Sequence, residues 1–215
     1  GAPVLYGGSP GIFDMRSMAA SISTVEAQMV DCAYIQVGKY LGLPTQAYIG
    51  MSDSKTLDAQ TGFESGTGLY LAGLAGVNSV SGPGMHYFES CQSLEKLVLD
   101  AEICAMSRRL SAGLEPREDF PADELFDQLL RDQSLLTADH TLKYLRQEHV
   151  IPGPVIDRTQ IQDGVSTEPD LMQRAGDEVR RHLDLYEPPS VLSAEQLRDL
   201  DAVMKAAAGG FKIPF

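Results

Sequence analysis

Side chains that can bind or react follow three short apolar runs in the first half of the chain, at residues 3–8, 46–51 and 78–84. Each run breaks into glycine and polar residues and then leads into a predicted helix. If the runs are neighbouring parallel strands, the segments just beyond them converge at one edge of the sheet. These segments are Phe13–Arg16, Ser52–Lys55 and Met85–Glu89. We therefore expect any chemistry of this protein to lie where they meet.

The charged residues of these segments suit recognition of a charged small molecule. Arg16 can clamp a carboxylate through two parallel hydrogen bonds, and its alternative is a local pair with Asp14. Asp53 and Lys55 are expected to form a compact polar pair, either as a structural ion pair or, as the position after a strand favours, in a functional role. His86 is the one histidine of four in a strand-end loop, where it either contacts a ligand or bonds to backbone.

Other residues at the strand ends have two interpretations each. Glu89 either neutralises a cation or caps the next helix. The turn with Ser81, Gly82 and Gly84 can cradle an anion, although a single glycine-rich turn is a weak signal. For Tyr6 and Tyr48 we favour burial in the core over a binding role. The five aromatic candidates at or beside the strand ends are Tyr6, Phe13, Tyr48, Tyr87 and Phe88.

Composition narrows the class of protein. A chain of 215 residues with 43% hydrophobic content can bury a sizeable core. Its net charge of -13, with 17 basic residues scattered among acids, argues against a nucleic-acid surface. No membrane span or signal peptide is recognisable, so we expect a cytoplasmic protein. The spacing of its cysteines and histidines predicts no metal site.

Three helices are predicted between and after the strands, at residues 23–41, 57–75 and 93–111, from capping residues and apolar periodicity. Ser23 and Glu26 have the spacing of a capping box, Gly42 ends the first helix, and Gly113 ends the third. This alternation of strands and helices predicts an α/β fold with a parallel sheet. A closed eight-stranded barrel needs about 250 residues, so three such units cannot close one.

From residue 115 the sequence changes character, because prolines interrupt it and no further strong strand is evident. Helices are predicted at 122–131, 139–148, 170–184 and 193–208, with capping patterns at Thr167–Asp170 and Ser193–Gln196. Proline-rich joints lie at 151–154 and 187–189. We therefore divide the chain into β/α units at residues 1–114 and a helical C-terminal extension at residues 115–215.

Several segments, in the same order, resemble the trimethylamine methyltransferase family. They are Gly1–Gly7, Phe13–Arg16, Ser52–Lys55, Asp58–Ser65, Ser93–Glu102 and His140–Lys143. The resemblance covers essentially the whole chain, which makes it more specific than any single motif. It implies that the chain is the C-terminal part of a TIM-type (β/α)8 barrel of roughly twice this length, followed by the helical extension.

The resemblance also implies a function: a corrinoid-dependent methyltransferase that moves a methyl group from a methylated or quaternary amine to the Co(I) of a separate corrinoid protein. Only ordinary residues occur in this sequence, so it is more similar to members that lack pyrrolysine, among them glycine betaine demethylases. The corrinoid would be carried by the partner protein and not bound directly. Homo-oligomerisation or association with an N-terminal half is expected, since this chain alone would be inactive.

For such a reaction the resemblance implies an aromatic cage around the cation, a partner for any substrate carboxylate and room for cobalt. Direct displacement by Co(I) needs no general base, so no catalytic residue is assigned. The predicted substrate-binding residues are Tyr6, Phe13, Arg16, Tyr48, Asp53, Lys55, His86, Tyr87, Phe88 and Glu89. The predicted corrinoid-facing residues are Ser81, Gly82, Gly84 and His86.

Two other functions stay open at this point. The chain can be a non-catalytic binding or assembly subunit whose missing half comes from another polypeptide, which would cover an open barrel edge. It can also be an unrelated barrel lyase or aldolase in which Lys55 forms a Schiff base.

Overall fold

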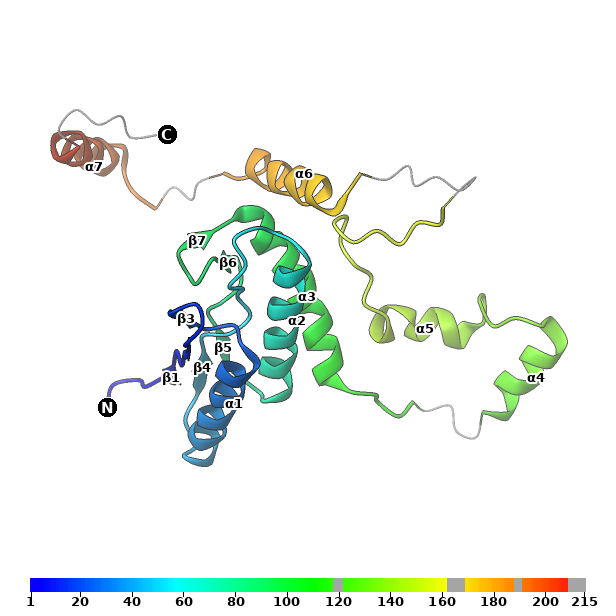
Figure 1. Cartoon of the computed structure of the whole chain (residues 1–215). Helices are drawn as coiled ribbons and strands as arrows, with labels where there is room; N and C mark the ends of the chain where they lie inside the picture. Colours follow the sequence, from blue (N-terminus) through cyan, green and yellow to red (C-terminus); the bar gives the residue numbers. More distant parts are fainter. Residues whose placement is uncertain (118–121, 162–168, 188–190, 209–215) are drawn as a thin grey trace. The chain divides into compact units, whose positions relative to one another are not determined.

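The computed structural model describes residues 1–117, 122–161, 169–187 and 191–208. The chain divides into two compact units, residues 1–180 and 181–215. The first unit contains a parallel sheet of three strands, β1 (Tyr6–Gly8), β4 (Thr45–Ala47) and β5 (Ser79–Val80), in the order β1-β4-β5 (Figure 1). Because the three strands are parallel neighbours, their carboxyl ends lie along one edge, as the sequence predicted.

Two short antiparallel hairpins were not predicted. One pairs β2 (Ile12–Asp14) with β3 (Ala19–Ser21), and the other pairs β6 (Met85–His86) with β7 (Cys91–Gln92). Strands of two or three residues are too short to show an alternating apolar pattern. As a result, the segment expected to be the loop after the first strand is instead part of the first hairpin.

The three predicted helices of the first half are present as α1 (Val25–Tyr40), α2 (Ala59–Leu74) and α3 (Leu94–Ala112). Asp58 and Ser93 cap α2 and α3 through their side-chain oxygens. The capping box predicted for Ser23 is wrong, because Thr24 caps α1 by accepting a hydrogen bond from the amide of Ala27 at 3.3 Å. Ser23 is buried, and its amide donates to Asp53 instead.

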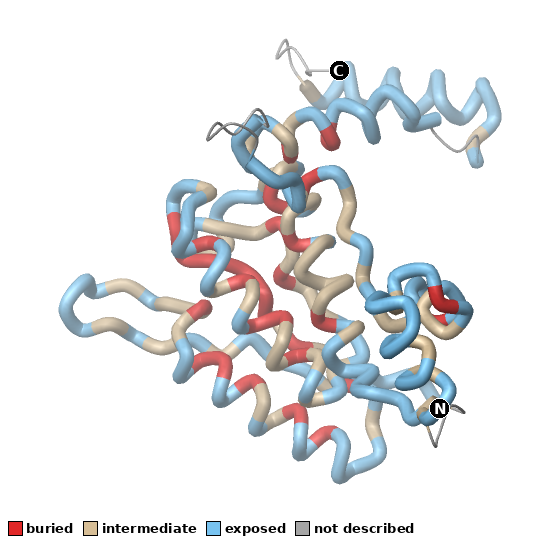
Figure 2. Tube along the Cα trace, turned by 90° about the vertical axis from the view of Figure 1, so that its right-hand side faces the viewer, coloured by how far each residue is buried: buried red, intermediate tan, exposed pale blue. Residues whose placement is uncertain are grey.

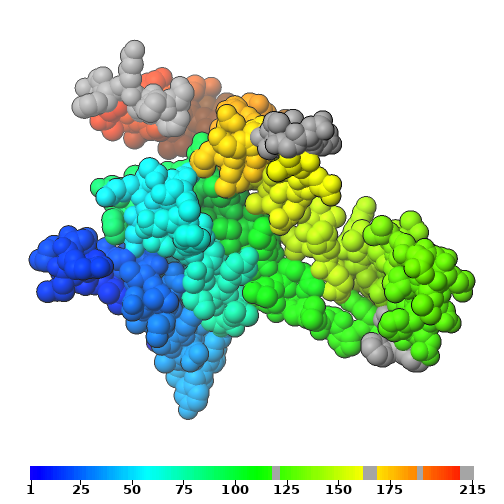
Figure 3. All heavy atoms as spheres, turned by 45° about the vertical axis from the view of Figure 1, so that its right-hand side comes forward, coloured from blue at the N-terminus to red at the C-terminus, as the bar shows by residue number. Residues whose placement is uncertain are grey.

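The core of the first unit lies between the sheet and the helices. It contains Ile35 of α1, Ala47 and Ile49 around β4, and Ala72 of α2. Figure 2 shows the buried positions of the chain concentrated in this unit. Helices α2 and α3 pack side by side (Figure 3). A Cβ on Gly73 would lie 2.5 Å from Ser107 Oγ, so this glycine allows the close approach of the two helices.

The four helices predicted for the C-terminal region are present as α4 (Asp123–Asp132), α5 (Asp139–Glu148), α6 (Leu171–Asp184) and α7 (Ala194–Ala207). Arg109 of α3 forms an ion pair with Glu148 at 2.6 Å, which ties the end of α5 to the first half of the chain. The capping box of Ser193 and Gln196 is confirmed. Thr167 and Glu168, and the prolines at 188 and 189, lie outside the described residues.

Residues 115–180 belong to the same compact unit as the β/α units at residues 1–114. The division at residue 114 into barrel units and a helical extension therefore stays a prediction. Among the described residues, no helix has the length and apolar character needed to cross a membrane.

Candidate functional site at the strand ends

The segment after β4 is buried and held by its polar groups. The carboxylate of Asp53 accepts hydrogen bonds from the hydroxyl of Ser21 and from the amides of Ile22 and Ser23, the two amides at 3.4 and 3.2 Å. Asp53 thus fastens the end of the first hairpin to the end of β4. Lys55 is exposed, and the predicted pair between Asp53 and Lys55 does not form, because these three donors already satisfy the carboxylate.

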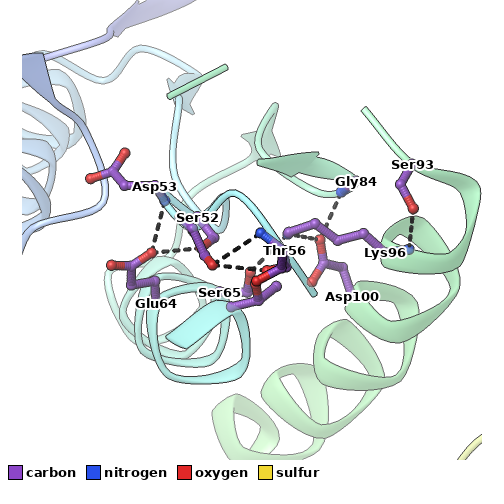
Figure 4. Close-up of polar contacts among 11 residues, drawn as sticks. Ser52, Asp53, Thr56, Glu64, Ser65, Gly84, Ser93, Lys96 and Asp100 are labelled. Carbon is purple, nitrogen blue, oxygen red and sulfur yellow. Dashed lines mark hydrogen bonds and ion pairs between the residues drawn. The ribbon is translucent and has the colours of Figure 1, made fainter. Parts of the chain in front are cut away.

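Glu64 of α2 holds the same segment from the other side (Figure 4). Its Oε2 accepts from Ser52 Oγ at 2.6 Å and from the amide of Asp53 at 2.8 Å. Ser52 Oγ in turn accepts from the amide of Ser54 at 2.9 Å. Hydrogen bonds to an ionised group are stronger than neutral ones, so this carboxylate fixes the backbone of the loop.

A buried ion pair in α3 lies beneath the neighbouring loop. The side chains of Lys96 and Asp100 are 0% and 1% exposed, and Lys96 Nζ lies 2.5 Å from Asp100 Oδ2 and 2.8 Å from Ser65 Oγ. The same Oδ2 accepts from the amide of Gly84 at 2.7 Å (Figure 4). Burial lowers the pKa of Lys96 and raises that of Asp100, and in each case the charge of the partner opposes the shift.

The loop of the second hairpin is strained. Tyr87, Phe88 and Glu89 have φ values of 53, 50 and 65°, so three consecutive residues other than glycine adopt left-handed backbone. The amide of Tyr87 donates to the carbonyl of Ser54 at 2.9 Å, and that of Ser90 donates to Tyr87. Strain of this kind persists only where the surroundings enforce it, and it is concentrated at functional sites.

Residues that follow β1 and β4 interact with Glu89, which follows β5. Burial, reinforced by the nearby charge of Asp53, raises the pKa of Glu89 despite hydrogen bonds from Ser9 and Tyr48. Burial and the charge of Glu89 likewise raise the pKa of Tyr48, whose hydroxyl lies 3.0 Å from the sulfur of Met85. Within the described part of the chain, Glu89 Oε1 is buried and has no hydrogen-bond partner. We call Ser9, Tyr48, Asp53 and Glu89 the strand-end cluster.

Three of the predicted residues lie elsewhere. Tyr6 packs against α1, with its ring 6.3 Å from that of Tyr34, in agreement with the core alternative. Phe13 is exposed on β2. The side chain of Arg16 is 91% exposed at the turn of the first hairpin and pairs with Asp14 at 3.0 Å, which lowers the pKa of Asp14 to about 2. The structure does not bring these residues into the strand-end cluster.

The glycine-rich turn after β5 already binds a carboxylate of this chain, that of Asp100. Gly84 has a φ of 89° and donates its amide to Asp100, so that amide is already engaged. A Cβ on Gly82 would lie 2.1 Å from the carbonyl oxygen of Ile49, which explains this glycine by close packing. Ser81 Oγ accepts from Gln46 Nε2 at 2.6 Å. The predicted cradle for an external anion is therefore not available at Gly84.

The model of one protein family, trimethylamine methyltransferase (MTTB), matches residues 1–208. The chain belongs to the trimethylamine methyltransferase family. This family was expected from the resemblance of ordered segments, and the match covers the strand ends, α2 and α3 together. The expectation is confirmed.

Curated relatives of this trimethylamine methyltransferase family member carry several substrate names. The chain is 32% identical over 192 residues to a glycine betaine methyltransferase of Desulfitobacterium hafniense (strain Y51), covering 89% of this chain and 40% of the relative. It is 30% identical to a proline betaine:corrinoid methyltransferase of Eubacterium limosum, covering 91% and 41%, respectively. It is 28% identical to trimethylamine methyltransferase MttB of D. hafniense (strain DSM 10664 / DCB-2), covering 87% and 38%. The chain thus spans about two fifths of these relatives.

Sequence reasoning missed the most buried charges of this family member. Lys96, Asp100 and Ser107 are the buried residues of α3, at helical spacing on one face. Apolar periodicity in this helix favours burial of its apolar face, because charged residues in a helix usually face solvent. The sequence signal for the two charges is the spacing of four residues between Lys96 and Asp100, which permits an ion pair within the helix.

The strand-end cluster can hold a cation, because two carboxylates and an aromatic ring meet there. His86 on β6 has a buried Nδ1 without a hydrogen-bond partner in the described part of the chain, so it can bond to a ligand. Tyr87 is partly exposed, and its ring lies 5.9 Å from that of Phe88. Among the described residues, no group of three or more His, Cys, Asp or Glu side chains is placed to hold a metal ion.

Proposed function

We propose that this family member is a corrinoid-dependent methyltransferase whose substrate is a methylated or quaternary amine, such as a betaine, and whose methyl acceptor is the Co(I) of a separate corrinoid protein. The names of the relatives, which include two betaine methyltransferases, support this substrate class. The observation that carries the proposal is Glu89, a half-buried carboxylate beside Tyr48 with one oxygen unpartnered in the described structure.

A quaternary ammonium ion has no N–H group, so it is recognised through its charge and through aromatic faces. Glu89 and Asp53 supply negative charge at the strand ends, and Tyr48 supplies a ring beside them. Tyr87 and Phe88 extend the aromatic surface from the strained loop. Binding of a cation favours the ionised form of Glu89, whose pKa is raised by burial and by the charge of Asp53. His86, through its free nitrogen, is the proposed partner for a substrate carboxylate.

In the proposed reaction the C–N bond breaks and its electron pair leaves with nitrogen, while the acceptor Co(I) supplies the electron pair of the new bond and becomes Co(III). The residues of this chain bind the cation, orient the methyl group and exclude water. They move no proton, so the absence of an assigned general base is consistent with the proposal.

We further propose that the parallel sheet is part of a TIM-type barrel with a helical extension. Strands β1 and β5 are the two edges of the sheet, and barrel closure would pair each with a strand from an N-terminal half. The corrinoid would be carried by the partner protein. Homo-oligomerisation and a cytoplasmic location stay predictions.

The experiment combines the full-length protein, a Co(I) corrinoid protein and a series of betaines and methylamines, with methyl-Co(III) absorbance as the readout. We expect turnover with a quaternary amine. Glu89→Gln should raise the KM for that amine by about tenfold, since a charged partner of the cation is lost. Glu26→Gln, at an exposed position of α1, is the control. Absence of turnover with every methylated amine would contradict the proposal.

The sheet edges favour one second candidate, a non-catalytic half-barrel that functions only as a binding or assembly subunit. Such a subunit would need a partner chain to cover β1 and β5. Light scattering of the purified chain tests this second candidate, because a stable, well-folded monomer argues against dependence on a partner.

A further inference from the structure

Two helices hold the two loops that form the candidate site. Glu64 of α2 binds the segment after β4, and the Lys96–Asp100 pair of α3 binds the turn after β5 (Figure 4). Only the second contact uses a buried ion pair. Replacing such a pair with apolar residues is often neutral or stabilising, so stability alone does not explain its presence.

Gly84 is bound by α3 at both of its backbone groups. Its amide donates to Asp100 Oδ2 at 2.7 Å, and its carbonyl accepts from the amide of Ser93, the capping residue of α3, at 3.0 Å. The hairpin with Tyr87, Phe88 and Glu89 begins at the next residue. The base of the strained loop is therefore fixed to the helix that contains the ion pair.

The tip of the same loop is fixed to the other strand end. Tyr87 donates its amide to the carbonyl of Ser54, whose own amide is bound through Ser52 to Glu64. The base and the tip of the loop with the three left-handed residues are therefore both held by hydrogen bonds. Glu89 then stays beside Tyr48, where its carboxylate is needed.

We propose that Lys96 and Asp100 are positioning residues: through the amide of Gly84 they hold the Tyr87–Glu89 loop in its strained conformation and so place Glu89 in the strand-end cluster. Lys96 acts by keeping Asp100 ionised and oriented inside the protein. The consequence for substrate binding rests on the proposed function, whereas the consequence for the loop does not.

Two double variants of the full-length protein isolate this role, because both remove the buried ion pair. Lys96→Met with Asp100→Asn keeps an oxygen that can accept from Gly84, and Lys96→Met with Asp100→Leu does not. Hydrogen–deuterium exchange of residues 84–92 should be about tenfold faster in the leucine variant than in the asparagine variant, since a buried amide loses its acceptor. Exchange in α1 should be the same in both variants. If the leucine variant does not fold, Asp100→Ala in the same background replaces it.

Equal exchange of residues 84–92 in the two double variants would overturn the proposal. Where the wild-type protein turns over an amine, the leucine variant should also raise its KM by about tenfold relative to the asparagine variant, with a smaller change in kcat. A merely structural role would lower the amount of active enzyme and leave KM unchanged. If no amine is turned over, the proposed function fails while the exchange experiment still decides the positioning role.

Discussion

Two carboxylates of the first unit are equally buried but have very different surroundings. Asp100 and Asp31 are each 1% exposed, and burial raises the pKa of both. Asp100 has a lysine ammonium and a backbone amide as partners. Asp31 has the hydroxyl of Tyr34 at 2.8 Å, and its Oδ2 has no hydrogen-bond partner within the described structure. The pKa of Asp31 accordingly rises to about 6.

The difference shows that burial does not by itself decide the charge of a carboxylate. The hydroxyl of Tyr34 lies within hydrogen-bond distance of three acceptors, Asp31 Oδ1, the carbonyl of Gly8 and the carbonyl of Gln46. One hydroxyl hydrogen cannot serve all three, and a protonated Asp31 that donates to the tyrosine oxygen reduces the acceptors that compete for it to the two carbonyls. Asp31 is thus suited to be neutral below about pH 6, whereas Asp100 is suited to be an anion that holds a loop.

The largest expected effect follows from removing the cation beside Asp100. Lys96→Met leaves a buried carboxylate with one amide partner, and the free energy of unfolding should fall by about 3–5 kcal/mol. Urea unfolding of the full-length protein measures it. Lys205→Met is the matched control, since Lys205 forms an exposed pair with Asp201 at the same spacing of four and should change stability little. Equal losses of unfolding free energy in both variants would show that burial of the Lys96–Asp100 pair does not determine its contribution to stability.

The second largest expected effect is a gain in stability, from replacing Asp31. Because the pKa of Asp31 is raised to about 6, the folded state binds more protons than the unfolded state between pH 4 and 6, and stability falls as pH rises through that window. Asp31→Asn removes the ionisation and should stabilise the protein by about 3 kcal/mol at pH 8, since each pH unit between the two pKa values contributes about 1.4 kcal/mol. Unfolding at pH 4 and pH 8 measures it. A gain that is the same at both values would contradict the assignment.

The sequence predicted the parts of the fold that depend on local signals. Apolar runs that end in glycine identified the three strands, and capping residues such as Ser93 and Gly113 located the helix ends. The strand-end cluster was partly foreseen, because parallel strands necessarily bring their ends together. The roles of Lys96 and Asp100 could not be foreseen in this way, since Ser65, the partner of Lys96, is 31 residues away and Gly84, the partner of Asp100, is 16 residues away, and they meet only after packing. The left-handed backbone at residues 87–89 could not be predicted either, because none of these residues is glycine.

A smaller effect is expected where a hydroxyl rather than a charge is removed. Tyr34→Phe withdraws the donor to the carbonyls at the ends of β1 and β4 and leaves Asp31 without a partner. We expect a loss of about 1–2 kcal/mol at pH 5, measured by urea unfolding. The loss should be smaller in the Asp31→Asn background, because the two side chains form one network. Strictly additive losses would show that they act independently.

The smallest effect on stability is expected for the ion pair of the first hairpin, in which Arg16 is exposed and Asp14 partly exposed. Arg16 lowers the pKa of Asp14 to about 2 through hydrogen bonds and charge, so any contribution of this pair is present above the ordinary pKa of Asp14 and is lost as pH falls toward 2. In Arg16→Ala the pKa of Asp14, followed by NMR titration, should return toward 3.8. The unfolding midpoint at pH 7 should not change measurably, because solvent screens an exposed pair. If the variant instead lost affinity for a carboxylate-bearing amine, Arg16 would be restored as a substrate clamp that reaches the strand ends only when substrate is bound.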